Sequence, residues 1–207
     1  MSVVVLISGR GSNLRALVEA GTPVAAVISN RADAAGVGFA RERRLPVAVV
    51  AHGAYPTRER FDEALAEEID RHAPRLVALA GFLRVLTPGF VRRFESRLLN
   101  VHPSLLPAFP GLDTHARALA AGVKVHGCTV HFVTADLDHG PIVVQAAVPV
   151  LADDDEPRLA ARVLAEEHRV YPQAVRWFLD GRLALADGRV RVREPGARQW
   201  RFGDRPA

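Results

Sequence analysis

The chain has 207 residues, 49% of them hydrophobic and 24% charged, so it can bury a core without disulfide or metal support. Its one cysteine excludes an internal disulfide and favours a reducing compartment, which we expect to be the cytoplasm. No apolar run approaches the roughly 20 residues of a membrane helix, and the first residues predict a strand rather than a signal peptide. The net charge is +4, but the arginines are scattered without interleaved aromatics, which favours a phosphate-bearing small substrate over nucleic acid.

The first half of the chain alternates short apolar runs with amphipathic stretches, a pattern typical of an α/β fold with a mainly parallel sheet. Strands are predicted at residues 3–8, 23–29, 47–50, 76–80 and 98–102. Helices are predicted at residues 12–20 and 34–43. A third helix is predicted after Thr57, which can cap it, and Phe61, Leu65 and Ile69 share one of its faces.

After residue 100 the alternation changes. A proline-rich segment leads into a helix near residues 113–121. Two β-branched runs, at 125–134 and 142–150, flank a tight turn and should pair as an antiparallel hairpin. Residues 155–180 predict a long helix that Pro172 should kink or divide. Residues 183–192 predict a terminal hairpin.

A glycine-rich segment, SGRGSNL at residues 8–14, directly follows the first strand. Glycines permit a tight turn and close approach of backbone N–H groups to an anion, and the start of the next helix adds a positive dipole end. Ser12 and Asn13 add polar side chains. Leu14 stands where the dinucleotide motif needs a third glycine, and the lysine of a P-loop is absent, so a phosphate monoester fits better than NAD or ATP. The alternative is a helix N-cap whose glycines serve only the turn.

Asn100 and His102 end the strand predicted at residues 98–102, at the sheet edge where open α/β folds place ligands. Being two residues apart in a strand, they should project to the same side. An amide beside an imidazole suits acyl transfer, because the amide stabilises an oxyanion and the imidazole carries the proton. The alternative is a structural pair bonded to the proline-rich loop. Asp138 lies in an acidic turn that is by default a solvated hairpin tip, unless its carboxylate partners His102.

Four motifs occur in a fixed order: SGRGSNL at residues 8–14, AGFLRVL at 80–86, NVHPSLLP at 100–107 and LDHGP at 137–141. Together they resemble the phosphoribosylglycinamide formyltransferases, folate-dependent enzymes of purine biosynthesis, over residues 2 to about 183. The Asn-His-Asp set is shared by the wider formyltransferase superfamily. The narrower resemblance rests on the Gly-x-Gly-Ser-Asn loop, on Phe-Pro-Gly at residues 109–111 and on the single-domain length.

The resemblance implies a Rossmann-like α/β fold, with a mainly parallel twisted sheet, a C-terminal antiparallel hairpin portion and helices on both faces. It implies one domain over residues 1–207. A phosphate-binding half would span about 1–100, a folate-binding and catalytic half about 80–181, and a terminal hairpin and tail 182–207.

The activity implied by the resemblance is transfer of the formyl group of 10-formyltetrahydrofolate, a co-substrate, to the amine of glycinamide ribonucleotide. Asn100, His102 and Asp138 match the catalytic trio of the family. The implied partners are these two small molecules, with no metal, nucleic acid or membrane, and the implied assembly is a monomer or homodimer.

The resemblance also implies the binding residues. Those expected at the substrate phosphate are Gly11, Ser12, Asn13 and Arg58. Glu167 falls where the family contacts the ribose hydroxyls. Those expected at the pterin ring of the folate are Arg84, Val85 and Leu86, opposite a wall from Thr134 to Asp138.

Two positions depart from the family pattern. Leu164 stands where a glutamine is frequent, three residues before Glu167, which affects part of the substrate contact. His139 replaces the first glycine of the turn, so the backbone there must suit a non-glycine residue and the folate wall can differ in shape.

Three other functions are compatible with parts of the sequence. A formyltetrahydrofolate hydrolase of the same superfamily uses water as the acceptor and usually carries an extra N-terminal domain. A transfer-RNA formyltransferase would need a further basic C-terminal domain, and about fifteen residues follow Val192. A non-catalytic nucleotide- or RNA-binding module would use the basic charge and make the Asn100, His102 and Asp138 set a coincidence.

A metal site is not expected, although five of the eight histidines lie between His102 and His139. No pair has the spacing of a zinc-binding helix, and one cysteine gives no thiolate cluster. His126 and His131 lie five residues apart in a predicted strand and should point to opposite faces. Cys128, between them, is expected to be a small core residue rather than a nucleophile.

Overall fold

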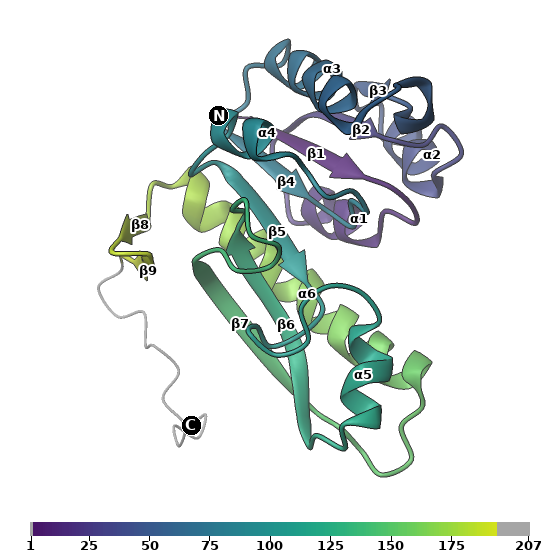
Figure 1. Ribbon diagram of the computed structural model, residues 1–207, viewed down its shortest axis with the longest axis vertical. Coiled ribbons are helices and arrows are strands. Elements are labelled where there is room, and N and C mark those ends of the chain that lie inside the picture. Colours follow the sequence, from purple (N-terminus) through teal and green to yellow (C-terminus); the bar gives the residue numbers. More distant parts are fainter. Residues whose placement is uncertain (1, 194–207) are drawn as a thin grey trace.

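The computed structural model describes residues 2–193 and contains a seven-stranded sheet of order β3-β2-β1-β4-β5-β6-β7 (Figure 1). Its strands are β1 (Val3–Ile7), β2 (Val24–Ser29), β3 (Val47–Val49), β4 (Leu76–Leu79), β5 (Leu98–His102), β6 (Val125–Phe132) and β7 (Ile142–Pro149). The first five strands pair in parallel, whereas β6 pairs antiparallel with both β5 and β7. A separate antiparallel hairpin consists of β8 (Leu183–Ala186) and β9 (Arg189–Val192). The prediction of a mainly parallel sheet with a C-terminal antiparallel portion is confirmed.

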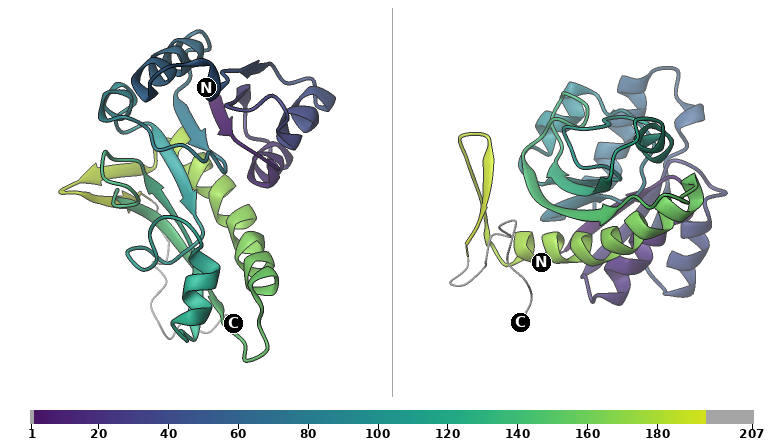
Figure 2. Two further views of the ribbon diagram at one scale, coloured as in Figure 1. Left: turned by 45° about the vertical axis from the view of Figure 1, so that its right-hand side comes forward. Right: turned by 90° about the horizontal axis from the view of Figure 1, so that it is seen from below.

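Helices cover both faces of the sheet, as Figure 2 shows from two further directions. They are α1 (Ser12–Glu19), α2 (Ala35–Glu42), α3 (Arg58–Asp70), α4 (Pro88–Arg93), α5 (Thr114–Ala120) and α6 (Glu156–Leu179), with a 3-10 turn, η1 (His52–Ala54). Among residues 2–193, no helix combines the length and apolar character needed to span a membrane.

The alternation of side chains along β1 explains the two layers, because successive residues of a strand face opposite sides of the sheet. Val3, Val5 and Ile7 pack into a core with α1, α2, α5 and α6, whereas Val4 and Leu6 pack into a second core with α3 and α4. The central strand is therefore buried on both faces. A parallel sheet of this kind places the loops after β1, β4 and β5 together at one edge.

Two elements differ from the sequence-based expectation. Helix α4 was not predicted: Thr87 caps it and Pro88 begins it, but its six residues are too few to give a periodic signal. Helix α6 is not divided by Pro172 but continues through it. The face that holds Pro172 is buried, and the adjacent Tyr171 hydroxyl donates to the carbonyls of Leu79 and Leu99. This packing compensates for the helix hydrogen bond that a proline lacks.

Candidate active site

The glycine-rich segment after β1 makes the turn that the sequence predicted. Gly11 has a left-handed backbone with φ of 73°, and a Cβ added there would lie 2.7 Å from Cα of Gly36. The turn is held against the start of α2 by the N–H of Gly36, which donates to the carbonyl of Gly9 over 3.0 Å. Only glycine fits this contact. Ser12 and Asn13 follow as the first residues of α1, where backbone N–H groups have no intrahelical partner and can bind an anion.

The groups predicted for the phosphate and for the ribose lie next to each other. Asn13 donates from Nδ2 to Oε2 of Glu167 over 2.7 Å, which joins the start of α1 to the middle of α6. Glu167 is buried, and burial raises the pKa of its carboxyl, while the hydrogen bond from Asn13 and the charge of Arg10 oppose that shift. Arg58, in contrast, is exposed at the first residue of α3, and no hydrogen bond or ion pair within residues 2–193 connects it to these groups.

The predicted trio comes together around one point. Asn100 and His102 project from the same face of β5, and Asp138 reaches them from the turn between β6 and β7. Nδ1 of His102 lies 3.5 Å from Oδ2 of Asp138, and both side chains are 7% exposed. The N–H of Gly111 donates to the same Asp138 oxygen over 2.8 Å. Asp138 is thus a buried partner of His102 and not a solvated hairpin tip.

His131 belongs to the same cluster, a role that the sequence did not suggest. Its Nε2 lies 3.2 Å from Nδ2 of Asn100 and 3.8 Å from Oδ1 of Asp138. Antiparallel pairing places His131 directly opposite Asn100. Only the register of β5 with β6, and no sequence motif, could have identified His131 as a member of this cluster. His126 packs elsewhere, edge-on to the rings of His115 and Phe109, as its position on the other face of β6 requires.

The hydrogen bonds of His131 fix the orientation of the Asn100 amide. Nδ1 of His131 is 2.9 Å from the carbonyl oxygen of Phe132, which can only accept, so Nδ1 carries a proton. Burial lowers the pKa of His131, which favours the neutral ring and leaves Nε2 as an acceptor. Only the NH₂ group of Asn100 can face that nitrogen. The amide therefore presents N–H groups, and not its oxygen, toward His131.

The nitrogens of His102 have separate partners. Nε2 donates to the carbonyl of Phe109 over 3.0 Å, so Nδ1 is the nitrogen that faces Asp138. A ring with protons on both nitrogens can donate to both partners. This arrangement can hold a proton close to a reacting group and return it.

The turn before β7 has a backbone conformation that allows a histidine at position 139. The left-handed residue is Asp138, with φ of 56°, so His139 needs no unusual backbone. The exposed His139 ring donates from Nδ1 to the carbonyl of Leu137 over 2.7 Å. Gly140 is the position that requires glycine, because a Cβ there would lie 1.7 Å from the carbonyl oxygen of Phe132.

The predicted folate segment lies beside the phosphate loop. Ser8 accepts at Oγ from the N–H of Leu83 over 2.8 Å, and its own N–H donates to the carbonyl of Gly81. Arg84 and Val85 are exposed, whereas Leu86 is buried. On the opposite wall, the Thr134 hydroxyl donates to the carbonyl of Asp136.

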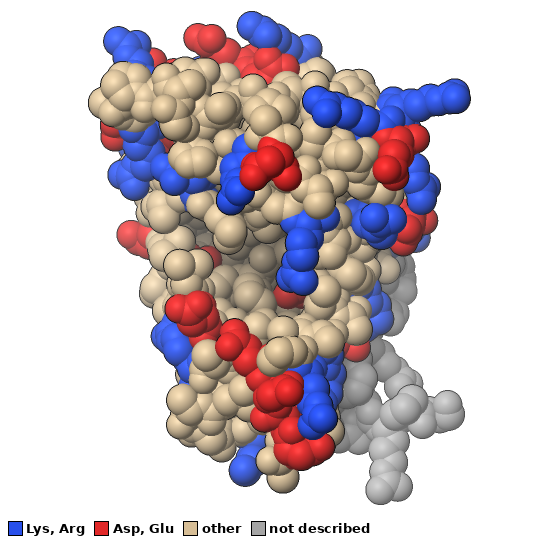
Figure 3. Space-filling view, turned by 90° about the vertical axis from the view of Figure 1, so that its right-hand side faces the viewer, with Lys and Arg blue, Asp and Glu red and all other residues tan. Residues whose placement is uncertain are grey.

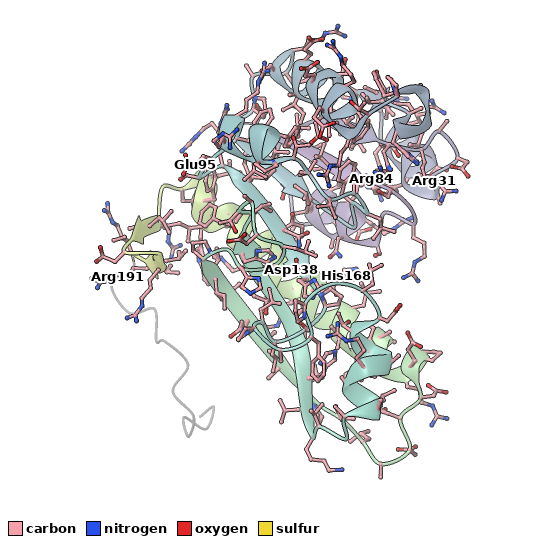
Figure 4. All side chains as sticks on the ribbon, in the orientation of Figure 1. Arg31, Arg84, Glu95, Asp138, His168 and Arg191 are labelled. Carbon is pink, nitrogen blue, oxygen red and sulfur yellow. The ribbon has the colours of Figure 1, made fainter. Side chains whose placement is uncertain are left out.

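Figure 3 shows a hollow in the face toward which β1 points, with basic side chains above it and acidic ones below. Arg84 lies on this side of the molecule (Figure 4). Val85 and Leu137, from the two predicted folate segments, and Leu83, which directly precedes the first of them, are exposed apolar side chains available to a flat ring system.

Two further features bear on the chemistry of the site, the grouping of potential metal ligands and the state of Cys128. Across residues 2–193, no three or more His, Cys, Asp or Glu side chains are grouped so as to hold a metal ion. Cys128 is fully buried in β6, and burial raises the pKa of its thiol to about 12, so it stays protonated at neutral pH.

A sequence model of the formyl transferase family matches residues 1–175. The chain belongs to the formyl transferase family. Phosphoribosylglycinamide formyltransferase of Escherichia coli is 50% identical over 192 residues, which is 89% of this chain and 90% of that protein. The same enzyme of Haemophilus influenzae is 41% identical, with the same coverage. The crystal structure of glycinamide ribonucleotide transformylase 1 from Symbiobacterium toebii has a TM-score of 0.92 and 49% identity, and 94% of each chain is covered. The expectation of an enzyme of this family is confirmed.

Proposed function

We propose that this protein transfers the formyl group of 10-formyltetrahydrofolate to the amine of glycinamide ribonucleotide, a step of purine biosynthesis. The observation that carries the proposal is the cluster of Asn100, His102 and Asp138 beside an anion-binding turn. The family match and the high identity over nearly the whole length of the bacterial enzymes support the same reaction. The buried cysteine supports a reducing compartment, such as the cytoplasm.

The two substrates would meet at the sheet edge. The phosphate is assigned to the N–H groups after Gly11 with Ser12 and Asn13, and the ribose hydroxyls to Glu167. The pterin ring is assigned to the segment from Arg84 to Leu86, against the wall from Thr134 to Asp138. Ser8 supports this pairing, since it begins the glycine-rich segment and accepts from the N–H of Leu83, the residue directly before the folate segment.

The reaction would be a direct transfer. The amine nitrogen attacks the formyl carbon, and the carbonyl oxygen becomes an oxyanion that the Asn100 amide and protonated His102 stabilise. The bond from the formyl carbon to N10 of the folate then breaks. The proton lost by the amine ends on N10, carried by His102 or by a water held by Asp138. The products are the formylated nucleotide and tetrahydrofolate, and no covalent enzyme intermediate is formed.

The direct test mixes the purified protein with 10-formyltetrahydrofolate and follows the absorbance of the released folate. We expect release only when glycinamide ribonucleotide is present, with the formylated nucleotide appearing in equal amount. Release without the nucleotide would indicate a hydrolase. Absence of release under both conditions, combined with salt-sensitive retention of RNA on a filter, would indicate a binding module instead.

The Glu167→Gln variant should change both nucleotide binding and the pH dependence of stability. Gln can still accept from Asn13 but carries no charge, so we expect nucleotide KM to rise about tenfold, because one charge-assisted bond to the ribose is lost. Burial raises the folded-state pKa of Glu167 above its ordinary value of 4.5. Ionised Glu167 therefore costs stability, and this cost appears as pH rises from the unfolded through the folded pKa.

The measurement is urea unfolding of both proteins at pH 5 and pH 8. The free energy of unfolding of the variant, relative to the unaltered chain, should increase from the lower to the higher pH. A constant difference at the two pH values would show that Glu167 is not ionised at a cost in the folded state.

A further inference from the structure

Both ends of the segment from Phe82 to Leu86 are held by buried side chains. At the first end, Ser8 accepts from the N–H of Leu83. At the second end, the N–H of Thr87 donates to Oδ2 of Asp62 over 2.6 Å. Between these two anchors the backbone is short, and its middle side chains are exposed. Phe82 and Leu86, at the two ends, also pack into the core, so the two hydrogen bonds and this packing together set the position of the exposed middle of the segment.

Asp62 is an unusual residue for its position. It lies on the buried face of α3 between Phe61 and Leu65, and only 3% of its surface is exposed. Oδ1 is buried and has no hydrogen-bond partner. Burial raises the pKa of this carboxyl, against the opposing effects of Thr87 and the charge of Arg58. A partly satisfied carboxylate in an apolar layer destabilises a fold.

Local structure does not require this carboxylate. Helix α3 has its own cap, since Thr57 accepts from the N–H of Arg60. Helix α4 is capped by the hydroxyl of Thr87, which accepts from the N–H of Phe90. The bond from Asp62 adds neither cap but connects α3 to the last residue before α4. Its structural consequence is to hold Thr87, through the backbone N–H and through a side-chain contact, and with it the end of the chain that leads into α4.

We propose that Asp62 is a positioning residue for the folate, which acts by holding Thr87 and so fixing the segment from Phe82 to Leu86 against the ligand. This inference rests on the proposed function, because the folate is the ligand assigned to Arg84–Leu86, the second part of that segment. Asp62 itself is buried behind the segment and does not reach the reacting atoms. Its loss should weaken folate binding and leave nucleotide binding nearly unchanged.

The test compares three substitutions in the full chain. Asp62→Ala removes the acceptor, Asp62→Asn keeps an acceptor of the same shape without charge, and Glu63→Ala removes the exposed neighbouring carboxylate, which pairs with Arg60. Exchange of the Thr87 amide with solvent is followed by NMR, and the Kd for tetrahydrofolate by calorimetry. In Asp62→Ala we expect faster Thr87 exchange and a tetrahydrofolate Kd about tenfold higher, since a buried N–H loses its partner.

The controls define the alternatives. The tetrahydrofolate Kd of Asp62→Asn should lie within about threefold of that of the unaltered chain, and the Kd of Glu63→Ala should equal it. The nucleotide Kd should change less than about twofold in all three variants. Unchanged tetrahydrofolate affinity in Asp62→Ala, despite faster Thr87 exchange, would overturn the inference. Equal weakening of both ligands would assign Asp62 a merely structural role and overturn it as well.

A second pair of variants covers the case in which Asp62→Ala does not fold. Thr87 has φ of −71°, which suits proline, so Thr87→Pro removes the N–H from the other end of the same bond. Thr87→Ala is the matched control, because both variants lose the hydroxyl, with its α4 cap and its contact to Asp62, and only the proline also loses the backbone N–H. Tetrahydrofolate should bind about tenfold more weakly to Thr87→Pro than to Thr87→Ala, and equal binding would overturn the inference. Failure of the unaltered chain to bind tetrahydrofolate would instead overturn the proposed function, and Thr87 exchange would still report whether Asp62 holds the segment.

Discussion

The Asn100→Ala variant should fold like the unaltered chain and turn over about 10²–10³-fold more slowly, the usual cost of removing one oxyanion donor. Asn100 is half-buried at the end of β5, and its NH₂ group is directed by the acceptor nitrogen of His131. That acceptor is fixed because the other His131 nitrogen donates to the carbonyl of Phe132. The donor is therefore already oriented before any substrate binds, so its loss should appear in kcat and not in KM.

Single-turnover kinetics and thermal unfolding are the measurements for this variant. Asn100→Asp serves as the matched control, since it keeps the shape of the side chain and replaces the donor with a second carboxylate near Asp138. It should be at least as slow as the alanine variant. Near-normal turnover of Asn100→Ala, with its fold intact, would mean that the oxyanion is stabilised elsewhere.

The sequence predicted the side chains of β5 correctly because their positions follow from strand geometry. Asn100 and His102 are two residues apart, so they had to share a face. The mainly parallel sheet followed from the alternation of apolar runs with amphipathic stretches, and the antiparallel hairpin from two β-branched runs around a tight turn, whereas the order of the strands was not predicted. Asp138 was placed near His102 by resemblance, because nothing local distinguishes its turn from a solvated one.

His131 and Asp62 show what a single sequence does not contain. His131 reaches Asn100 only because β6 pairs with β5 in one particular register, and a shift by one residue would send it to the other face. Asp62 occupies a position where an amphipathic pattern gives no reason to expect a buried carboxylate, since its partner lies 25 residues further along the chain. Both contacts depend on tertiary packing, which periodicity does not report.

The His102→Ala variant is expected to lose about 10²–10⁴-fold in kcat, the range for removal of a general acid–base group. Nε2 of His102 is held by the carbonyl of Phe109, and Nδ1 faces Asp138 at 3.5 Å, so the ring is fixed between two acceptors. Without the ring, no side chain in this position can pass a proton from the amine toward the folate. Steady-state kcat, measured with both substrates saturating, checks this expectation.

A double-mutant cycle decides whether His102 and Asp138 act together. Asp138 touches His102 and the N–H of Gly111, so Asp138→Asn, in which the amide oxygen can still accept from Gly111, removes mainly the charge beside the ring. Groups that act as a unit are strongly non-additive. The double variant His102→Ala/Asp138→Asn should therefore be about as slow as His102→Ala alone, to within about threefold. If the two losses multiplied instead, Asp138 would contribute independently of the imidazole, most simply by holding a water, and the proton path would run through that water rather than through His102.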